Sequence, residues 1–195
     1  MSVGILAYGS LLANPGEEIE SVKVEKKADV VTPFSVEFAR TSRRRRGAPT
    51  LVPVPGDGSR VKASVLVLEC SVEDAIDRLY RREVNAVGSG RRYRHSNTLG
   101  PDTVVIRRID GLVGVDVVLY TEIAANIPDL TPLRLAELAI ESARGSSDRR
   151  DGISYLMDAR AHGIETTLSN DYEAEIKRLM RADTLAEARE KACRA

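Results

Sequence analysis

One carboxylate in the sequence lies at a helix position where an apolar residue is expected. The segment that begins at Ser71 predicts an amphipathic helix, because its apolar residues are spaced by three and four; they are Val72, Ala75, Ile76, Leu79 and Tyr80. The same spacing continues to Glu83 and Val84. Burial disfavours the charged form of a carboxylate and moves its pKa toward the range in which a general base works near neutral pH. Glu83 is therefore a candidate general acid and base; the alternative is that its side chain turns to water or pairs with a neighbouring arginine.

A second candidate group is the turn that follows the first apolar strand. Residues 3–7 lead directly into Tyr8-Gly9-Ser10-Leu11. Glycine permits an abrupt turn, in which successive backbone N–H groups can point at one carboxylate or at a polarised carbonyl oxygen. The hydroxyls of Tyr8 and Ser10 can add hydrogen bonds. The alternative is an ordinary strand end.

Cysteine and histidine are too few and too scattered for a metal centre of the usual kind. Cys70 and Cys193 match no metal-ligand spacing and are expected to be free thiols, and His95 and His162 are isolated. We therefore expect no metal, and chemistry that comes from carboxylates, hydroxyls, arginines or backbone groups.

Composition narrows the class of protein and its partners. The 195 residues, 43 % hydrophobic and 30 % charged, fit one globular domain over residues 1–195. The 29 basic and 29 acidic residues cancel, so net charge does not argue for a nucleic-acid or anionic-membrane partner. No apolar run approaches the roughly 18 residues of a membrane span, and the N-terminal segment lacks a basic leader. We expect a cytoplasmic protein without a membrane or nucleic-acid partner; its oligomeric state stays open.

The elements that must position these groups form an α+β pattern, with strands first and a helical C-terminal portion over residues 131–195. Strands are expected in residues 3–8, in part of 22–38, and in 61–68, 103–109 and 113–120. Besides the helix that contains Glu83, helices are expected from Thr131-Pro132 to Gly145 and over residues 152–161, 170–180 and 184–192. Asp110-Gly111 indicates a hairpin connection.

Two motifs occur in a characteristic order. Tyr8-Gly9-Ser10-Leu11 ends the first strand, and Tyr80-Arg81-Arg82-Glu83-Val84 follows much later. Together they resemble the gamma-glutamylcyclotransferase superfamily, most closely its ChaC-like branch, whose members share a Y-G-S-x turn and a catalytic glutamate. Arg46-Gly47-Ala48-Pro49 and Gly152-Ile153-Ser154-Tyr155-Leu156 agree with the resemblance, which extends over residues 3–180.

The resemblance implies a small barrel-like mixed β-sheet with flanking helices and a cofactor-independent lyase. In the implied reaction, the α-amine of a γ-glutamyl group attacks its own γ-amide carbonyl, which forms 5-oxoproline and releases the attached amine, amino acid or peptide. Glu83 would accept and return the proton, and backbone N–H groups of Gly9 to Leu11 would hold the small-molecule substrate. The main task of such an enzyme is to hold a bent conformer.

The group attached to the γ-glutamyl moiety stays open. Relatives that act on glutathione, which would release Cys-Gly, often carry an aromatic residue after the turn, where this chain has Leu12-Ala13-Asn14. Tyr93 is a further candidate for substrate binding, with a half-buried core tyrosine as the alternative. Arg46 is a candidate for a substrate carboxylate. If residues 43–46 were a strand, Arg43 and Arg45 would face one side and Arg44 and Arg46 the other; a solvated loop is the alternative.

Two rival functions are kept beside the cyclotransferase. One is a noncatalytic module that binds or senses γ-glutamyl ligands. The other is a nucleic-acid-associated protein that uses the arginines of residues 43–46 and 91–94, which zero net charge disfavours.

Overall fold

The computed structural model describes residues 1–95 and 100–195, and their contacts divide the chain into two compact units. The first unit consists of residues 1–32 and 62–124, and the second of residues 33–61 and 125–195. Each unit is thus assembled from two separate stretches of sequence. The single domain expected over residues 1–195 stays a prediction.

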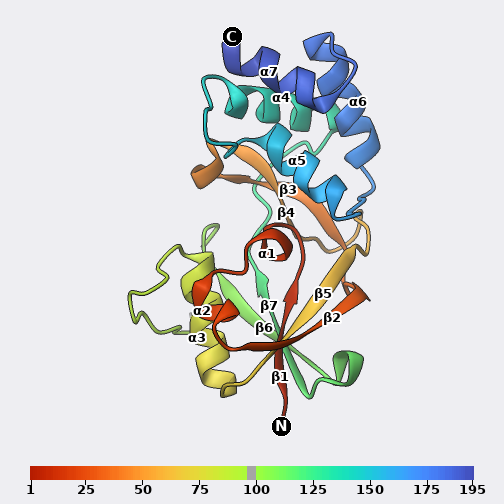
Figure 1. Cartoon of the computed structure of the whole chain (residues 1–195). Helices are drawn as coiled ribbons and strands as arrows, with labels where there is room; N and C mark the ends of the chain where they lie inside the picture. The colour runs from red at the N-terminus through yellow and green to blue at the C-terminus, as the bar shows by residue number, and fades with distance from the viewer. Residues whose placement is uncertain (96–99) are drawn as a thin grey trace. The chain divides into compact units, whose positions relative to one another are not determined.

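The first unit is built on a mixed five-stranded sheet (Figure 1). Its strands are β1 (Val3–Ala7), β2 (Lys23–Val31), β5 (Lys62–Leu68), β6 (Val105–Asp110) and β7 (Val117–Glu122). Their order is β2-β5-β1-β7-β6; β1 pairs in parallel with β7, and the other neighbours are antiparallel. The five strands expected from the sequence therefore share one sheet, and the hairpin expected at Asp110-Gly111 is confirmed.

The barrel-like shape expected from the sequence is wrong, because this sheet is open. β2 and β6 are its two edges and are not neighbours in the strand order. Closure would require backbone pairing between them, and both edges carry charges that oppose such pairing: lysines and a glutamate in β2, and Arg107 and Arg108 in β6.

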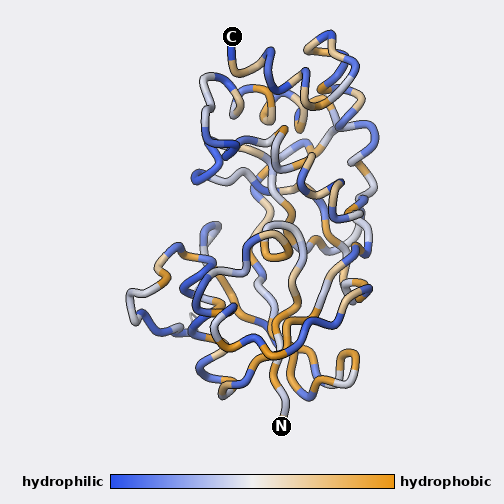
Figure 2. The backbone as a smooth tube through the Cα atoms, viewed as in Figure 1, coloured by the Kyte–Doolittle hydropathy of each residue, from blue (hydrophilic) through white to orange (hydrophobic). Residues whose placement is uncertain are grey.

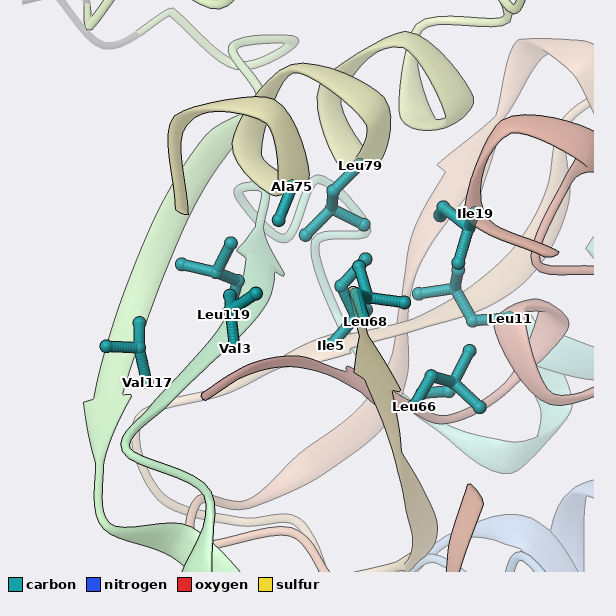
Figure 3. Packing of buried hydrophobic residues seen from close by; sticks show 11 residues of the cluster. Val3, Ile5, Leu11, Ile19, Leu66, Leu68, Ala75, Leu79, Val117 and Leu119 are labelled. Carbon is teal, nitrogen blue, oxygen red and sulfur yellow. The ribbon is translucent and has the colours of Figure 1, made fainter. Parts of the chain in front are cut away.

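The amphipathic helix is α3 (Val72–Glu83), which packs on the sheet through one face. Ser71 caps its N-terminus: the Ser71 hydroxyl accepts a hydrogen bond of 3.1 Å from the Asp74 N–H. Ala75 and Leu79 are completely buried and point at apolar side chains of β1, β5 and β7 (Figure 3). Their burial confirms the apolar face up to Leu79 and fixes the rotation of the helix about its axis.

Two short helices follow β1 and were not expected from the sequence. They are α1 (Ser10–Ala13) and α2 (Glu17–Glu20). A single turn is too short to show helical periodicity. Each helix adds one buried apolar side chain, Leu11 and Ile19, to the core beneath α3 (Figure 3). This burial attaches the segment after β1 to the sheet.

The second unit contains a two-stranded antiparallel hairpin of β3 (Val36–Ser42) and β4 (Ala48–Pro53). The alternating strand considered for residues 43–46 is wrong, because Arg43–Arg45 form the short 3₁₀ helix η1 at the hairpin tip. Arg46 and Gly47 both have positive φ, 55° and 82°, which the reversal of the chain requires. The tip is strongly hydrophilic in Figure 2, which matches the solvated loop that was the alternative.

The helical C-terminal portion also belongs to the second unit. It consists of α4 (Pro132–Ala143), α5 (Gly152–Ala161), α6 (Ser169–Met180) and α7 (Leu185–Arg194), close to the expected ranges. Thr131 caps the N-terminus of α4, since its hydroxyl accepts a hydrogen bond from the Arg134 N–H at 3.2 Å. No helix in the described ranges is long and apolar enough to cross a membrane.

Candidate functional site

Glu83 is the last residue of α3, and its side chain is 21 % exposed. Its Oε1 accepts a hydrogen bond of 2.7 Å from Nη1 of the adjacent Arg82. Consecutive residues of a helix do not face each other, so this ion pair forms only because both long side chains bend toward one point. The carboxylate is therefore paired with a neighbouring arginine, which is the alternative that the sequence left open.

The point on which they converge is the turn after β1. Nη2 of Arg82 donates to the Ser10 hydroxyl at 3.1 Å and to the backbone carbonyl of Asn14 at 2.9 Å. Ser10 and Glu83, far apart in the sequence, thus bind the same guanidinium group. Both lie in the first unit.

The turn itself depends on Gly9, whose φ of 54° and ψ of −129° lie in a region that side chains disfavour. The Leu11 N–H donates to the Tyr8 carbonyl at 3.2 Å, so it is already used within the turn. The N–H groups of Gly9 and Ser10 donate to no other residue in the described part of the chain. The backbone N–H groups of Gly9 and Ser10 can therefore donate to a ligand. They lie next to the Ser10 hydroxyl, which accepts a hydrogen bond from Arg82.

Tyr8 directly precedes Gly9 in this turn and is 9 % exposed. Its hydroxyl donates to the backbone carbonyl of Thr121 on β7 at 3.5 Å, which is long for a hydrogen bond. Oγ1 of the same threonine is buried and has no hydrogen-bond partner among the described residues. Thr121 is a polar residue beside the turn that the sequence does not single out, because it sits in an apolar strand.

Tyr93 is held by contacts within the first unit. Its N–H donates to Asp77 Oδ1 at 2.7 Å, and its ring packs edge-on against Tyr80, with 5.4 Å between the ring centroids. Its hydroxyl accepts from the Ile106 N–H at 3.3 Å. These contacts match the half-buried tyrosine considered as the alternative, and its contact with substrate stays a prediction.

Arg46 belongs to the second unit, at the tip of the β3–β4 hairpin. Its side chain is 44 % exposed, and its Nη2 lies 4.0 Å from Asp148 Oδ1. The adjacent Arg45 stacks on the Tyr155 ring at 4.7 Å. A substrate contact of Arg46 stays a prediction as well.

Three arginines on the polar face of α3 hold the segment after β1. Besides the contacts of Arg82, Arg78 donates to the Glu18 carbonyl at 2.5 Å. Arg81 is only 8 % exposed; it donates to Glu18 Oε2 at 2.6 Å and to the Arg91 carbonyl at 2.9 Å. A signal was present in the sequence: the acidic run at residues 17–20 complements the arginine-rich end of the helix.

Glu18 is the electrostatic centre of these contacts. The hydrogen bond from Arg81 lowers the pKa of the Glu18 carboxyl below its usual value, although partial burial opposes that change. Its other oxygen accepts from the Gly88 N–H at 2.5 Å. One carboxylate thereby joins α2 to α3 and to the loop that follows α3.

Together these residues place a carboxylate and a hydroxyl within hydrogen-bond distance of one guanidinium group. Such a set can bind a small polar ligand of mixed charge and exchange a proton with it. No group of three or more potential metal ligands occurs in residues 1–95 and 100–195.

No protein-family model, curated protein or solved structure gives a significant match to this chain.

Proposed function

We propose that the site at the end of α3 is that of a gamma-glutamylcyclotransferase-type lyase. The substrate is a small molecule with a γ-glutamyl group. Its α-amine nitrogen forms a bond to the γ-carbonyl carbon, the amide C–N bond breaks, and 5-oxoproline and a free amine are released. The reaction is redox-neutral and needs only the movement of protons.

The observation that carries the proposal is that Ser10 and Glu83 bind one guanidinium group. The sequence motifs suggest that the turn and the glutamate act together, and this shared contact is what such joint action requires. The α-ammonium nitrogen loses two protons as it becomes the lactam N–H. In the proposed mechanism the Glu83 carboxylate accepts each of them in turn and delivers it to the leaving nitrogen, which departs as an ammonium group. The unused N–H groups of Gly9 and Ser10 hold the glutamyl moiety in a bent conformer.

Replacement of Glu83 by Gln tests the assignment of the acid/base. The amide keeps the size of the side chain and cannot exchange a proton at neutral pH. Formation of 5-oxoproline from a panel of γ-glutamyl peptides and amines should fall by roughly 10²- to 10⁴-fold.

Glu73→Gln is the matched control, because it makes the same change at an exposed position of the same helix and should leave turnover nearly unchanged. Near-normal turnover in a folded Glu83→Gln protein would contradict the proposed role of Glu83.

A noncatalytic module that binds γ-glutamyl ligands is the second candidate. The ion pair between Arg82 and Glu83 favours it, because Oε1 of the carboxylate is already engaged by a cation. The two candidates differ in one measurement. Binding of γ-glutamyl compounds without release of 5-oxoproline across the panel would support the module and exclude the lyase.

A cytoplasmic location is part of the same proposal. Cys70 and Cys193 are free thiols, as expected from the sequence, and free thiols fit a reducing compartment. Cell fractionation with an antibody against the protein tests the location.

A further inference from the structure

Thr121, next to the end of β7, carries a buried hydroxyl that the rest of the chain does not satisfy. The residue is 9 % exposed, and its Oγ1 has no hydrogen-bond partner among the described residues. A hydroxyl buried without a partner destabilises the folded chain, whereas valine has nearly the same shape, suits a strand and carries no polar group. A ligand that forms a hydrogen bond with this hydroxyl would remove the destabilisation.

The topology places this hydroxyl on the face of the sheet that α3 covers. Side chains alternate along a strand, and Leu119 of β7 points into the core beneath α3 (Figure 3). The side chain of Thr121 therefore lies on the same face. The parallel register that pairs Ile5 with Leu119, continued by two residues, places Thr121 beside Ala7, where β1 enters the turn.

The C-terminal end of α3 lies at this same end of the sheet. Leu68 at the end of β5 is opposite Val3 at the start of β1, and α3 begins soon after β5 ends. The helix packs on β1 and β7, so its C-terminal end lies toward the end of β1. The contacts of Ser10 and Glu83 with Arg82 agree with this direction. The buried hydroxyl thus shares one end of the sheet with the turn and with the candidate acid and base.

This end of the sheet offers three hydrogen-bond donors of the same kind of use. They are the N–H groups of Gly9 and Ser10 and the hydroxyl of Thr121. A carbonyl oxygen has two lone pairs and accepts more than one hydrogen bond. In the proposed reaction the γ-carbonyl oxygen gains negative charge as the amine attacks, and hydrogen bonds to it then become stronger. The Glu83 carboxylate is an acceptor, so it suits a nitrogen of the ligand and does not compete for that oxygen.

We propose that the Thr121 hydroxyl donates to the γ-carbonyl oxygen of the ligand, as a third donor beside Gly9 and Ser10. Rotation about the Cα–Cβ bond moves a threonine hydroxyl between staggered positions, so it can turn toward the ligand. The inference rests on the proposed function and adds to it a residue that neither the motifs nor the family resemblance indicates. Thr121 is then a catalytic residue, because it touches the carbonyl that reacts.

Replacement of Thr121 by Val should change stability and function in opposite directions. Removal of the unpartnered hydroxyl should raise the melting temperature by roughly 2 to 4 °C. Loss of the donor should lower kcat for the release of 5-oxoproline from γ-glutamyl compounds by about 10- to 100-fold. Thr121→Ser keeps the hydroxyl and should keep most of the turnover. A threonine with a packing role alone would not produce this combination.

Thr50→Val is the matched control, because it makes the same change on a strand of the second unit. The Thr50 hydroxyl already donates to the Arg40 carbonyl at 3.0 Å. Its removal therefore deletes a hydrogen bond that the chain makes. This variant should show no rise in melting temperature, and its kcat should stay nearly unchanged.

Two ligands test which group of the ligand the hydroxyl binds. L-Glutamine is the simplest γ-glutamyl amide, and L-norvaline has the same carbon chain without the amide group. Binding is measured by NMR titration of the whole chain. Thr121→Val should bind L-glutamine about 2- to 10-fold more weakly than the unmodified chain does, and it should bind L-norvaline with unchanged affinity.

The inference is overturned if Thr121→Val keeps the full kcat, if it weakens the binding of both ligands equally, or if it lowers the melting temperature. It is also overturned if the unmodified chain does not bind L-glutamine. If Thr121→Val does not fold, Thr121→Ala takes its place in the turnover and binding measurements. Failure of the proposed function is distinguishable, because then no γ-glutamyl compound yields 5-oxoproline while Thr121→Val still weakens the binding of L-glutamine alone.

Discussion

At the scale of single residues, the candidate site depends on a carboxylate that is paired rather than isolated. Arg82 fixes Glu83 at 2.7 Å and joins it to Ser10 at 3.1 Å. A charged hydrogen bond at a half-buried position is stronger than a neutral one. The arginine therefore contributes to the orientation of the carboxylate, although the sequence motif draws attention to the glutamate.

The hydroxyl of Ser10 should matter for the ligand and little for the fold. In Ser10→Ala, Arg82 keeps its bonds to Asn14, so the free energy of unfolding should change by no more than about 0.5 kcal/mol. Loss of one hydrogen bond at the site should weaken apparent substrate affinity by roughly 3- to 10-fold. Urea unfolding and steady-state kinetics measure the two effects.

Ser21→Ala, which removes a hydroxyl 3.5 Å from Arg78, is the control and should alter neither stability nor substrate affinity. A large loss of stability in Ser10→Ala alone would show that Ser10 has a structural role instead.

At the scale of elements, the position of the site depends on how α3 is fastened to the segment after β1. The buried face of α3 orients the helix through Ala75 and Leu79, and its arginines hold α1 and α2. Among these contacts, the Glu18–Arg81 ion pair is the one expected to stabilise the attachment of α2 to α3 most, because Arg81 is buried and the Glu18 carboxylate is only 19 % exposed. Removal of either partner leaves a charge in a poorly solvated place.

Glu18→Gln should destabilise the protein at pH 7 by about 1 to 3 kcal/mol. The pKa of Glu18 in the folded chain is lowered from 4.5, so the ionised carboxylate stabilises the folded state. This contribution is complete above about pH 4.5 and is lost as the pH falls through the lowered folded-state pKa. The stability difference between the unmodified chain and Glu18→Gln should therefore shrink below pH 4.5. Denaturant unfolding at a series of pH values checks this, with the exposed Glu17→Gln as control; a difference that grows on acidification would contradict the assignment.

At the scale of the whole molecule, each unit joins segments that are distant in the sequence around one core. In the second unit, Phe38 from β3 is completely buried, and its ring lies 6.1 Å from that of Tyr155 and 5.4 Å from that of Tyr172. Glu37 beside it is also buried and accepts hydrogen bonds from Thr166 and Leu168. The helices of residues 131–195 thus depend on a strand some hundred residues earlier.

Phe38→Ala should destabilise the second unit by about 3 to 5 kcal/mol, the usual cost of deleting a large buried side chain. The informative measurement is the helical circular dichroism signal, since Phe38 itself is in a strand. Helical signal should be lost at a lower temperature in Phe38→Ala. Leu133→Ala, at a position 43 % exposed on α4, should change stability by no more than about 0.5 kcal/mol. Helices that melt at an unchanged temperature in Phe38→Ala would show that they do not need the hairpin.

Elements with local signals could be predicted from the sequence. Periodicity predicted α3 and the C-terminal helices, and hydroxyl caps at Ser71 and Thr131 marked two of their starts, because a cap bonds only to residues three positions away. Alternation and turn residues predicted the five strands of the first sheet. β4 was not among the expected strands; it contains Pro49 and Pro53, and proline weakens the signal of a strand. The sequence also drew attention to Glu83 and to the turn at Tyr8–Leu11.

The surroundings of Glu83 depend on how distant segments pack in the folded chain. The periodicity of the sequence places Arg78, Arg81 and Arg82 on the polar face of α3, and the polar face of an amphipathic helix ordinarily contacts water. In the fold, residues 10–21 lie there instead, because Leu11 and Ile19 are buried in the core beneath the helix. Contacts between segments about seventy residues apart leave no local pattern, since they depend on the order and register of the strands that bring the segments together. For the same reason the open edges of the sheet, the pairing of Glu83 with Arg82 and the burial of Arg81 are properties of the folded chain.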